Sequence, residues 1–130
     1  MKQVVAALIV RGDEVLICQR TKHQPMPLQW EFPGGKIDPG ETAAEALRRE
    51  LEEELDVQAT IGREVATIRH TYKNGGELEL HFFLVSKYTG EIANLIFKDI
   101  RWEKLANLPR YDFLEADLGL VKDIAKGKVL

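Results

Sequence analysis

The sequence has only one cysteine, Cys18, which excludes an internal disulfide and leaves no set of thiolates for a metal site. Positive charge is not in excess either, because 18 Lys and Arg stand against 21 Asp and Glu, and the net charge is −3 at pH 7. A basic surface for a nucleic acid polymer is therefore not expected. The N-terminal apolar run, Val4–Val10, is too short to span a bilayer, and no small-residue cleavage site follows it. These absences predict a cytoplasmic protein that binds neither a membrane nor a nucleic acid polymer.

The sequence does contain enough apolar material for a core. Its 130 residues are 45% hydrophobic, which favours a globular domain over disorder. No repeat, low-complexity tract or linker divides the chain, so we expect one domain over residues 1–130. Cys18 ends an apolar stretch that begins at Val15, and a cysteine in such a buried strand packs as a small hydrophobic residue.

Apolar patterns along the chain predict more strands than helices. Short apolar or alternating runs bounded by turn residues predict strands over residues 3–10, 14–20, 58–70, 77–87 and 99–103. The first two should form a hairpin, and a loop with two prolines, 21–29, should follow them. Helical periodicity predicts helices over 42–55 and 116–126. This order does not fit simple βαβ alternation, and it favours an α+β fold or an αβα sandwich around a mixed sheet.

The helix over 42–55 has the clearest signals at its start and along one face. Thr42 and Glu45 match a capping box. Leu47, Leu51 and Leu55 recur every four residues and define a buried stripe. The closing helix has a weaker pattern of the same kind.

In the closing helix, an apolar face is expected from Leu118, Val121, Ile124 and Ala125. Gly127 follows, and glycine often ends a helix. We therefore expect this face to pack on the sheet.

Three carboxylates, Glu50, Glu53 and Glu54, form a cluster beside the buried stripe of the first helix. Glu50 and Glu54 have no Lys or Arg three or four residues away, and they repel each other at i,i+4. All three lie near the negative end of the helix dipole, so we expect nothing in the helix to compensate them. An exposed acidic helix end is one interpretation. A site for a divalent cation is the other, because Mg²⁺ binds carboxylate and phosphate oxygens together.

The opposite flank of this helix looks like an ordinary solvated surface. Glu45 is expected to pair with Arg48 or Arg49, and Arg48 with Glu52, at helical spacings. Such pairs stabilise a helix by a few tenths of a kcal/mol. The two flanks therefore have different charge balances.

A glycine-rich segment precedes the helix. Gly34 and Gly35 allow a ligand or metal to approach the main chain, although turns use Gly-Gly constantly. Lys36 beside them offers a positive charge for a phosphate.

Together the loop and the helix resemble a known family. Gly35, Glu41, the run Arg49-Glu50-Leu51-Glu52-Glu53-Glu54 and Val57 reproduce the Nudix box over residues 35–57 at its full spacing. Further likenesses to its MutT-type subgroup, the nucleoside triphosphate pyrophosphohydrolases, are Arg20, Trp30-Glu31-Phe32-Pro33, the strand 80–85, Trp102 and Ala116-Asp117. That subgroup includes enzymes that remove oxidised guanine nucleotides.

The resemblance implies a Nudix-type αβα sandwich and a metal-dependent hydrolysis. It implies Mg²⁺, with Mn²⁺ as a substitute, bound by Glu50, Glu53, Glu54 and the carbonyl of Gly35. Either Glu53 or Glu50 would also act as the general base. Arg49 would orient the carboxylates without touching the substrate.

Substrate contacts are expected from other segments. Lys36 and Arg20 are expected to contact phosphate, and Glu41 to tie the loop to the helix or to bind metal. Asp117 matches a position where MutT-like proteins contact the base. As a carboxylate it would accept hydrogen bonds from cytosine or guanine edges; the alternative is that it caps the last helix.

Other candidates have ordinary structural explanations. Leu78, Leu80 and Phe82 share one strand face and either line a base pocket or fill the core. His70 and His81 lack a third metal ligand at a recognisable spacing and are interpreted as strand residues.

Two positions depart from the family pattern. Asp56 stands where Gly is usual, which a left-handed C-cap tolerates at modest cost. The loop 94–99 lacks the Glu that MutT-like enzymes often carry there, and Asp99 is the available substitute.

The predicted function is hydrolysis of a nucleoside triphosphate to the monophosphate and pyrophosphate, including removal of modified nucleotides such as 8-oxo-dGTP or modified dCTP. One alternative is hydrolysis of a nucleoside diphosphate linked to another group, of the ADP-ribose type. A second is a non-catalytic nucleotide sensor. The protein is expected to be a monomer or a homodimer.

Overall fold

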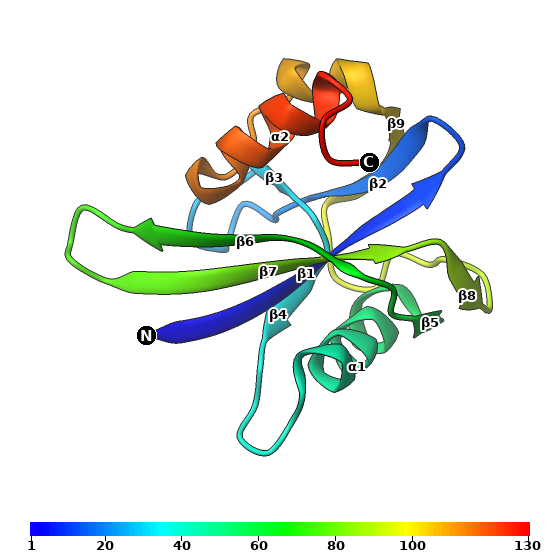
Figure 1. The fold of residues 1–130 in the computed structure, drawn as a ribbon, viewed down its shortest axis with the longest axis horizontal. Helices are drawn as coiled ribbons and strands as arrows, with labels where there is room; N and C mark the ends of the chain where they lie inside the picture. The colour runs from blue at the N-terminus through cyan, green and yellow to red at the C-terminus, as the bar shows by residue number, and fades with distance from the viewer.

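A mixed β-sheet separates two helical layers in the computed structural model, which describes residues 1–130 (Figure 1). The strands are β1 (Lys2–Arg11), β2 (Glu14–Gln19), β3 (Trp30–Glu31), β4 (Gly34–Lys36), β5 (Gln58–Thr60), β6 (Glu64–Thr71), β7 (Glu77–Val85), β8 (Lys87–Thr89) and β9 (Asp99–Lys104). The helices are α1 (Ala43–Leu55) and α2 (Leu118–Ala125), with short 3₁₀ helices η1 (Leu105–Arg110) and η2 (Glu115–Asp117). The predicted αβα sandwich is confirmed. Neither helix is long and apolar enough to cross a membrane.

The sheet is mixed because β1 pairs in parallel with β7 and antiparallel with its other neighbours. Its strand order is β3-β2-β1-β7-β6, with β4 added to β1 and β9 added to β2. A separate ribbon, β5 with β8, lies beyond the end of α1. The parallel pairing of β1 with β7 joins the N-terminal strand to a strand about 75 positions further along the chain, Lys2 to Leu78 for example.

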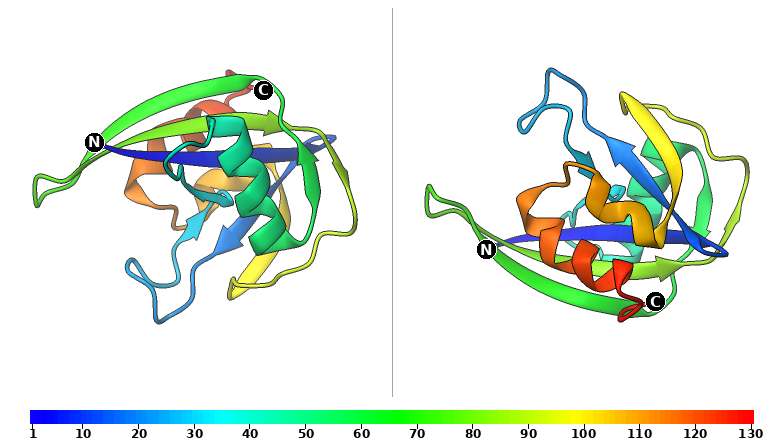
Figure 2. Two further views of the ribbon diagram at one scale, coloured as in Figure 1. Left: turned by 90° about the horizontal axis from the view of Figure 1, so that it is seen from below. Right: turned by 90° about the horizontal axis from the view of Figure 1, so that it is seen from above.

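The predicted hairpin of β1 and β2 divides the sheet into two wings, one of β1, β4 and β7 and the other of β2, β3 and β9. The two strands pair only next to the turn, at Val10↔Val15 and Arg11↔Glu14. Away from the turn, β1 pairs with β4 and β7, whereas β2 pairs with β3 and β9. Figure 2 shows β2 leaving the corner of the hairpin in a different direction from β1. This opening between the wings is where the candidate site lies.

Alternation along β1 supplies both layers of the core. Val5, Ala7 and Ile9 pack in the cluster that contains α1, and Ala6 and Leu8 pack in the cluster that contains α2. Successive side chains of a strand point to opposite faces, which explains why a continuous apolar run occurs here. Cys18 is fully buried on the α1 side, as predicted.

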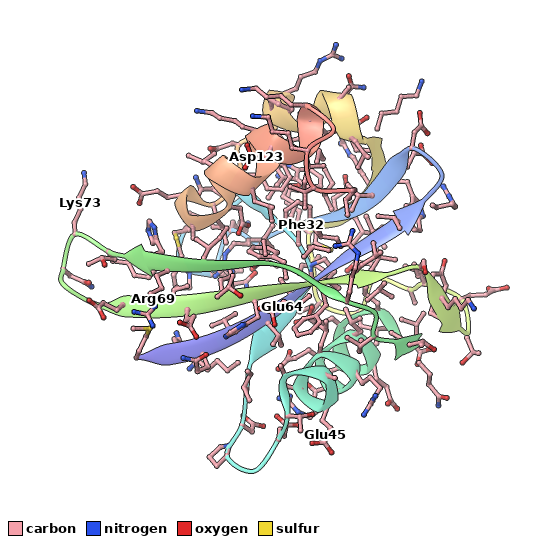
Figure 3. The ribbon with its side chains drawn as sticks, viewed as in Figure 1. Phe32, Glu45, Glu64, Arg69, Lys73 and Asp123 are labelled. Carbon is pink, nitrogen blue, oxygen red and sulfur yellow. The ribbon has the colours of Figure 1, made fainter.

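Phe32 links the sheet to the α2 layer. It lies near the centre of the molecule, between α2 and the sheet (Figure 3). Its ring packs edge-on against Phe82 and at a tilt against Phe113, with ring centroids 6.1 and 5.3 Å away. An aromatic side chain so deeply buried contributes about 2–3 kcal/mol through its area alone.

The predicted signals at both ends of α1 are confirmed. The Thr42 side chain accepts from the Glu45 backbone N–H, and the Glu45 side chain accepts from the Thr42 N–H. At the other end Asp56 adopts a left-handed conformation, with φ 59°. Leu47, Leu51 and Leu55 are fully buried, as the four-residue repeat predicts.

Several element boundaries differ from the sequence prediction. The strand expected over 58–70 is interrupted at residues 61–63, where the Gly62 N–H donates to the Leu84 carbonyl. A Cβ on Gly62 would lie 2.6 Å from that oxygen, so the close approach needs glycine. The last α-helix begins at Leu118, after η2. Leu118 is 43% exposed and Leu120 is buried instead, so this part of the predicted apolar face was wrong.

Candidate active site

A cavity of about 590 Å³ occupies the opening between the two wings. Gly35 and Glu54 line its walls, as do Tyr72 and Asp117 from distant segments. Arg20 and Glu31 line it as well, and the charge of Glu31 acts on both Glu54 and Asp117. The cavity therefore connects the acidic side of α1 to the segment before α2.

Glu54 is the buried member of the acidic cluster. Its side chain is 7% exposed, and its Oε1 accepts a hydrogen bond of 3.2 Å from the Gly34 N–H. Burial first, and then the nearby charge of Glu50, raise the pKa of the Glu54 carboxyl well above its usual range. A cation placed between Glu50 and Glu54 would relieve both effects.

The two glycines of the loop have different neighbours. A Cβ on Gly34 would lie 2.0 Å from the Val5 carbonyl oxygen, so Gly34 is needed for β4 to pack on β1. A Cβ on Gly35 would lie 2.5 Å from the carboxyl carbon of Glu50. Gly34 therefore serves the fold, and Gly35 keeps space open around an acidic side chain.

Arg49 compensates part of the acidic cluster, which corrects the expectation that nothing in the helix does so. Its Nη1 lies 2.9 Å from Glu50 Oε1 and 3.5 Å from Glu53 Oε2. The contact with Glu50 spans one position and the contact with Glu53 spans four, and both agree with the role of orienting the carboxylates that the family resemblance implies for Arg49. The sequence predicts a pair of Glu45 with Arg48 or Arg49, but Arg49 does not pair with Glu45. The Glu45 side chain takes part in the capping box instead.

Glu41 ties the loop to α1 through the same arginine. Its carboxylate accepts from Arg49 Nε at 2.8 Å and Nη2 at 3.0 Å, and from the Asp38 N–H at 2.9 Å. These hydrogen bonds, Arg49 first, lower the pKa of Glu41 to about 2. The geometry matches the expected tying role of Glu41.

The residues of this corner fit a divalent cation. As the side chains lie, no three of them form a group that could hold a metal ion. However, the donor set is all oxygen, as Mg²⁺ prefers. Gly35 leaves space beside Glu50, and Glu54 is buried next to the charge of Glu50. Glu53 is 59% exposed, so its side chain has room to change rotamer towards a bound cation.

Of the two predicted phosphate contacts, Lys36 is exposed at the rim of the cavity, whereas Arg20 is held inside it. Arg20 Nη1 donates to both carboxylate oxygens of Glu31, at 3.2 and 3.1 Å, and Nε donates to the Pro25 carbonyl at 2.9 Å. Glu31 was not identified as a site residue from the sequence. The available signal was a charged residue between two apolar positions, Trp30 and Phe32, both of which are buried.

Asp117 is 3% exposed and lines the cavity without any hydrogen bond from its carboxyl group to the chain. It makes no capping hydrogen bond to α2, so the alternative role as a cap is wrong. Burial, and secondly the charge of Glu31, raise the pKa of Asp117 to about 8. At neutral pH it is therefore mostly a neutral acid that can donate as well as accept, and not the acceptor-only carboxylate expected from sequence.

Apolar and aromatic side chains surround Asp117. Leu78 and Leu80 line the cavity and also belong to the α2-side core, so both interpretations of these residues hold. Phe82 is fully buried and does not line the cavity. Tyr72, which sequence reasoning missed, brings an aromatic ring to this wall from the end of β6.

Three other candidates lie outside the site. Asp99 does not line the cavity, and its carboxylate accepts from Arg101 Nε at 2.9 Å, so it does not act as the substitute for the missing Glu. His81 is hydrogen-bonded to Glu64 and Gln3 on the sheet. His70 packs edge-on against the Tyr72 ring, and neither histidine belongs to a metal-binding group.

Comparison with known proteins places the chain in a family. A model described as the NUDIX domain matches residues 1–123, so the protein belongs to the Nudix family. It is 34% identical over 122 residues to the CTP pyrophosphohydrolase of Escherichia coli (strain K12), covering 94% of this chain and 90% of that protein. It is 28% identical over 123 residues to the 8-oxo-dGTP diphosphatase of Buchnera aphidicola subsp. Schizaphis graminum, covering 95% and 92%.

A solved structure supports the same grouping. It is reported in a structure and function analysis of MutT from Aliivibrio salmonicida and Vibrio cholerae, and it matches with a TM-score of 0.82 at 30% identity. The match covers 97% of this chain and 98% of that one. The likeness to the MutT-type subgroup is thereby confirmed.

Proposed function

We propose that this protein hydrolyses a nucleoside triphosphate to the monophosphate and pyrophosphate, with Mg²⁺ as the metal and Mn²⁺ as a substitute. One observation carries the proposal: a single cavity joins the acidic side of α1 to a buried carboxyl group, Asp117, that has no partner in the chain. Its volume of about 590 Å³ lies within the range of roughly 300–1,000 Å³ typical of small-molecule sites. The names of the relatives agree with this reaction.

Groups that line the cavity, and others beside it on α1, have separate tasks in this reaction. Glu50, Glu53, Glu54 and the Gly35 carbonyl would hold the metal, which neutralises phosphate charge and lowers the pKa of water when bound. Glu53 or Glu50 would accept the proton of the attacking water. Arg49 would keep these carboxylates oriented without touching the substrate, as its contacts with Glu41, Glu50 and Glu53 support.

Arg20 and Lys36 would bind the phosphates, Arg20 from inside the cavity and Lys36 from its rim. Asp117 would bind the Watson–Crick edge of the base. In its neutral form it can donate to a ring nitrogen and accept from an adjacent amino group, which matches N3 and N4 of cytosine or N1 and N6 of adenine. In its ionised form it would favour the two donors on guanine and its oxidised forms. A cytosine or adenine nucleotide is therefore the expected substrate class below pH 8.

We further propose that the protein acts in the cytoplasm as a monomer or homodimer, without a nucleic acid polymer as partner. Its net charge of −3 supports the last point.

The test is a panel of ordinary and modified triphosphates, incubated with protein and Mg²⁺ at pH 6.5 and pH 9. We expect monophosphate and pyrophosphate as products, and a ratio of kcat/KM for dCTP over dGTP that falls with rising pH. Release of inorganic phosphate alone, or turnover of ADP-ribose without turnover of triphosphates, would overturn the proposed reaction. A ratio that does not change with pH would overturn the proposed recognition of the base by Asp117.

The matched variant is Glu53→Gln. Its side chain is 59% exposed, so the free energy of unfolding should change by less than about 0.5 kcal/mol. We expect kcat to fall by about 10³-fold or more, because a metal ligand or general base is lost. Glu52→Gln, on the other flank of α1, is the control and should leave kcat unchanged.

A further inference from the structure

Arg20 and Glu31 form an ion pair on the wall of the cavity, with side chains only 15% and 18% exposed. Two of the three guanidinium nitrogens of Arg20 are engaged: Nη1 by both oxygens of Glu31 and Nε by the Pro25 carbonyl. Nη2 makes no hydrogen bond within the chain. The guanidinium is thus held through two of its three nitrogens, and Nη2 retains unused donors on a side chain that lines the cavity.

The sheet determines where Glu31 lies relative to Arg20. Strands β2 and β3 pair at Cys18↔Glu31 and Gln19↔Trp30, and Arg20 follows directly after β2. The Arg20 N–H also donates to the Gln29 carbonyl at 2.9 Å, so the backbone beside the side chain is fixed as well. Glu31 therefore stands on a rigid element, which suits a residue that positions another.

Fold stability does not explain this pair. With side chains only 15% and 18% exposed, the pair is largely withdrawn from water, and apolar side chains of similar volume stabilise a fold at least as well as a pair of charges buried to this extent. Burial raises the pKa of the Glu31 carboxyl even though Arg20 acts in the opposite direction. The desolvation of Glu31 thus exceeds the compensation that Arg20 gives it.

We propose that Glu31 is a positioning residue that holds the Arg20 guanidinium with Nη2 free to donate to the polyphosphate of the nucleotide. Glu31 itself does not touch the substrate; it acts through Arg20. An arginine that is already held in its binding geometry loses less side-chain freedom when the nucleotide arrives. The inference rests on the proposed function, because it takes the polyphosphate as the group that Arg20 binds.

A double-mutant cycle tests the proposal in the full chain with Mg²⁺ and the best triphosphate of the panel. The variants are Glu31→Ala, Arg20→Ala and the two combined. We expect each single variant to raise KM about tenfold while kcat changes less than about threefold, as for loss of one charge-assisted hydrogen bond. We expect the double variant to match Arg20→Ala, because Glu31 has nothing left to position.

Two further variants separate positioning from a merely structural role. Glu31→Gln retains an oxygen that accepts from Nη1, so it should recover most of the KM lost in Glu31→Ala. Arg20→Lys keeps the positive charge but has a single nitrogen, so Glu31 has no forked guanidinium to position. Adding Glu31→Gln to Arg20→Lys should therefore change KM little. The exposed pair of Arg11 and Glu14, 3.2 Å apart, is the control; Glu14→Ala should leave KM unchanged. Binding of a non-hydrolysable α,β-methylene triphosphate, measured by calorimetry, should show the same pattern in Kd.

The outcomes distinguish this inference from the proposed function. If the rises in KM of the two single variants multiply in the double variant, Glu31 acts independently of Arg20 and the inference is overturned. An unchanged KM and Kd in Glu31→Ala would overturn it as well. If Glu31→Ala does not fold, the same cycle is made with Glu31→Leu, which fills the space but accepts no hydrogen bond from Nη1. Absence of triphosphate turnover and binding in the wild-type protein would instead refute the proposed function.

Discussion

Replacement of Asp117 by asparagine should stabilise the protein in a pH-dependent way. The ordinary pKa of an aspartate carboxyl is 3.8, and burial raises that of Asp117 to about 8. Because the folded protein prefers the protonated form, the contribution of Asp117 to stability is complete below pH about 4 and is lost as the pH rises through about 8. Asparagine has a similar shape and no charge at any of these values.

The size of the effect follows from the difference between the two pKa values. Each unit of that difference corresponds to about 1.4 kcal/mol. At pH 7, about three units above the pKa of the unfolded chain, Asp117 is ionised in the unfolded state but still protonated in the folded state. This difference lowers the unfolding free energy of the wild-type protein by at most about 4 kcal/mol. The buried amide of asparagine also lacks partners, which costs about 1–3 kcal/mol. We therefore expect Asp117→Asn to be more stable than wild type by about 2 kcal/mol at pH 7, with a difference near zero at pH 5 and a larger one at pH 8.

The assay is urea unfolding of wild type and Asp117→Asn at several pH values across this range. The exposed Asp123 of α2, labelled in Figure 3, provides the control Asp123→Asn. We expect the difference in unfolding free energy between Asp117→Asn and wild type to widen as the pH rises, and the control to follow wild type. A difference that stays constant between pH 5 and pH 8 would refute the inference that Asp117 is buried as a neutral acid.

Three other substitutions separate catalysis from folding. Gly35→Ala should leave the unfolding free energy within about 1 kcal/mol of wild type, because its Cβ meets only the movable end of Glu50, 2.5 Å away, but kcat should fall about 100-fold as that carboxylate is displaced. Gly34→Ala should instead unfold the protein, since its Cβ would lie 2.0 Å from a backbone oxygen of β1. Equal stability of the two variants would contradict this assignment. Asp56→Gly should raise the unfolding free energy by about 0.5–1 kcal/mol without changing kcat, because Asp56 holds a left-handed conformation, with φ 59°, that glycine adopts freely. Thermal unfolding is the measurement. A loss of stability would show that the Asp56 side chain stabilises the fold by more than its backbone conformation costs.

The sequence by itself determined the local parts of the protein. The capping box, the buried leucine stripe of α1 and the left-handed end at Asp56 depend on neighbours within a few residues, so their periodicity and spacing were sufficient. The placement of the acidic residues on one flank of α1 followed from the same helical geometry. The Nudix box is likewise a local pattern of residue types at fixed spacing, so the amino-acid sequence alone identifies it.

Only the tertiary structure decided which distant segments share the cavity and how they are charged. Arg49 holds Glu41 because the loop before α1 folds back onto the helix, whereas its contacts with Glu50 and Glu53 lie within α1 itself. The raised pKa of Asp117 depends on the burial of its carboxyl group and on the charge of Glu31, which lies far from it in sequence. Strand pairing sets these distances, and a pairing between remote segments leaves no periodic signal in the sequence that would reveal it.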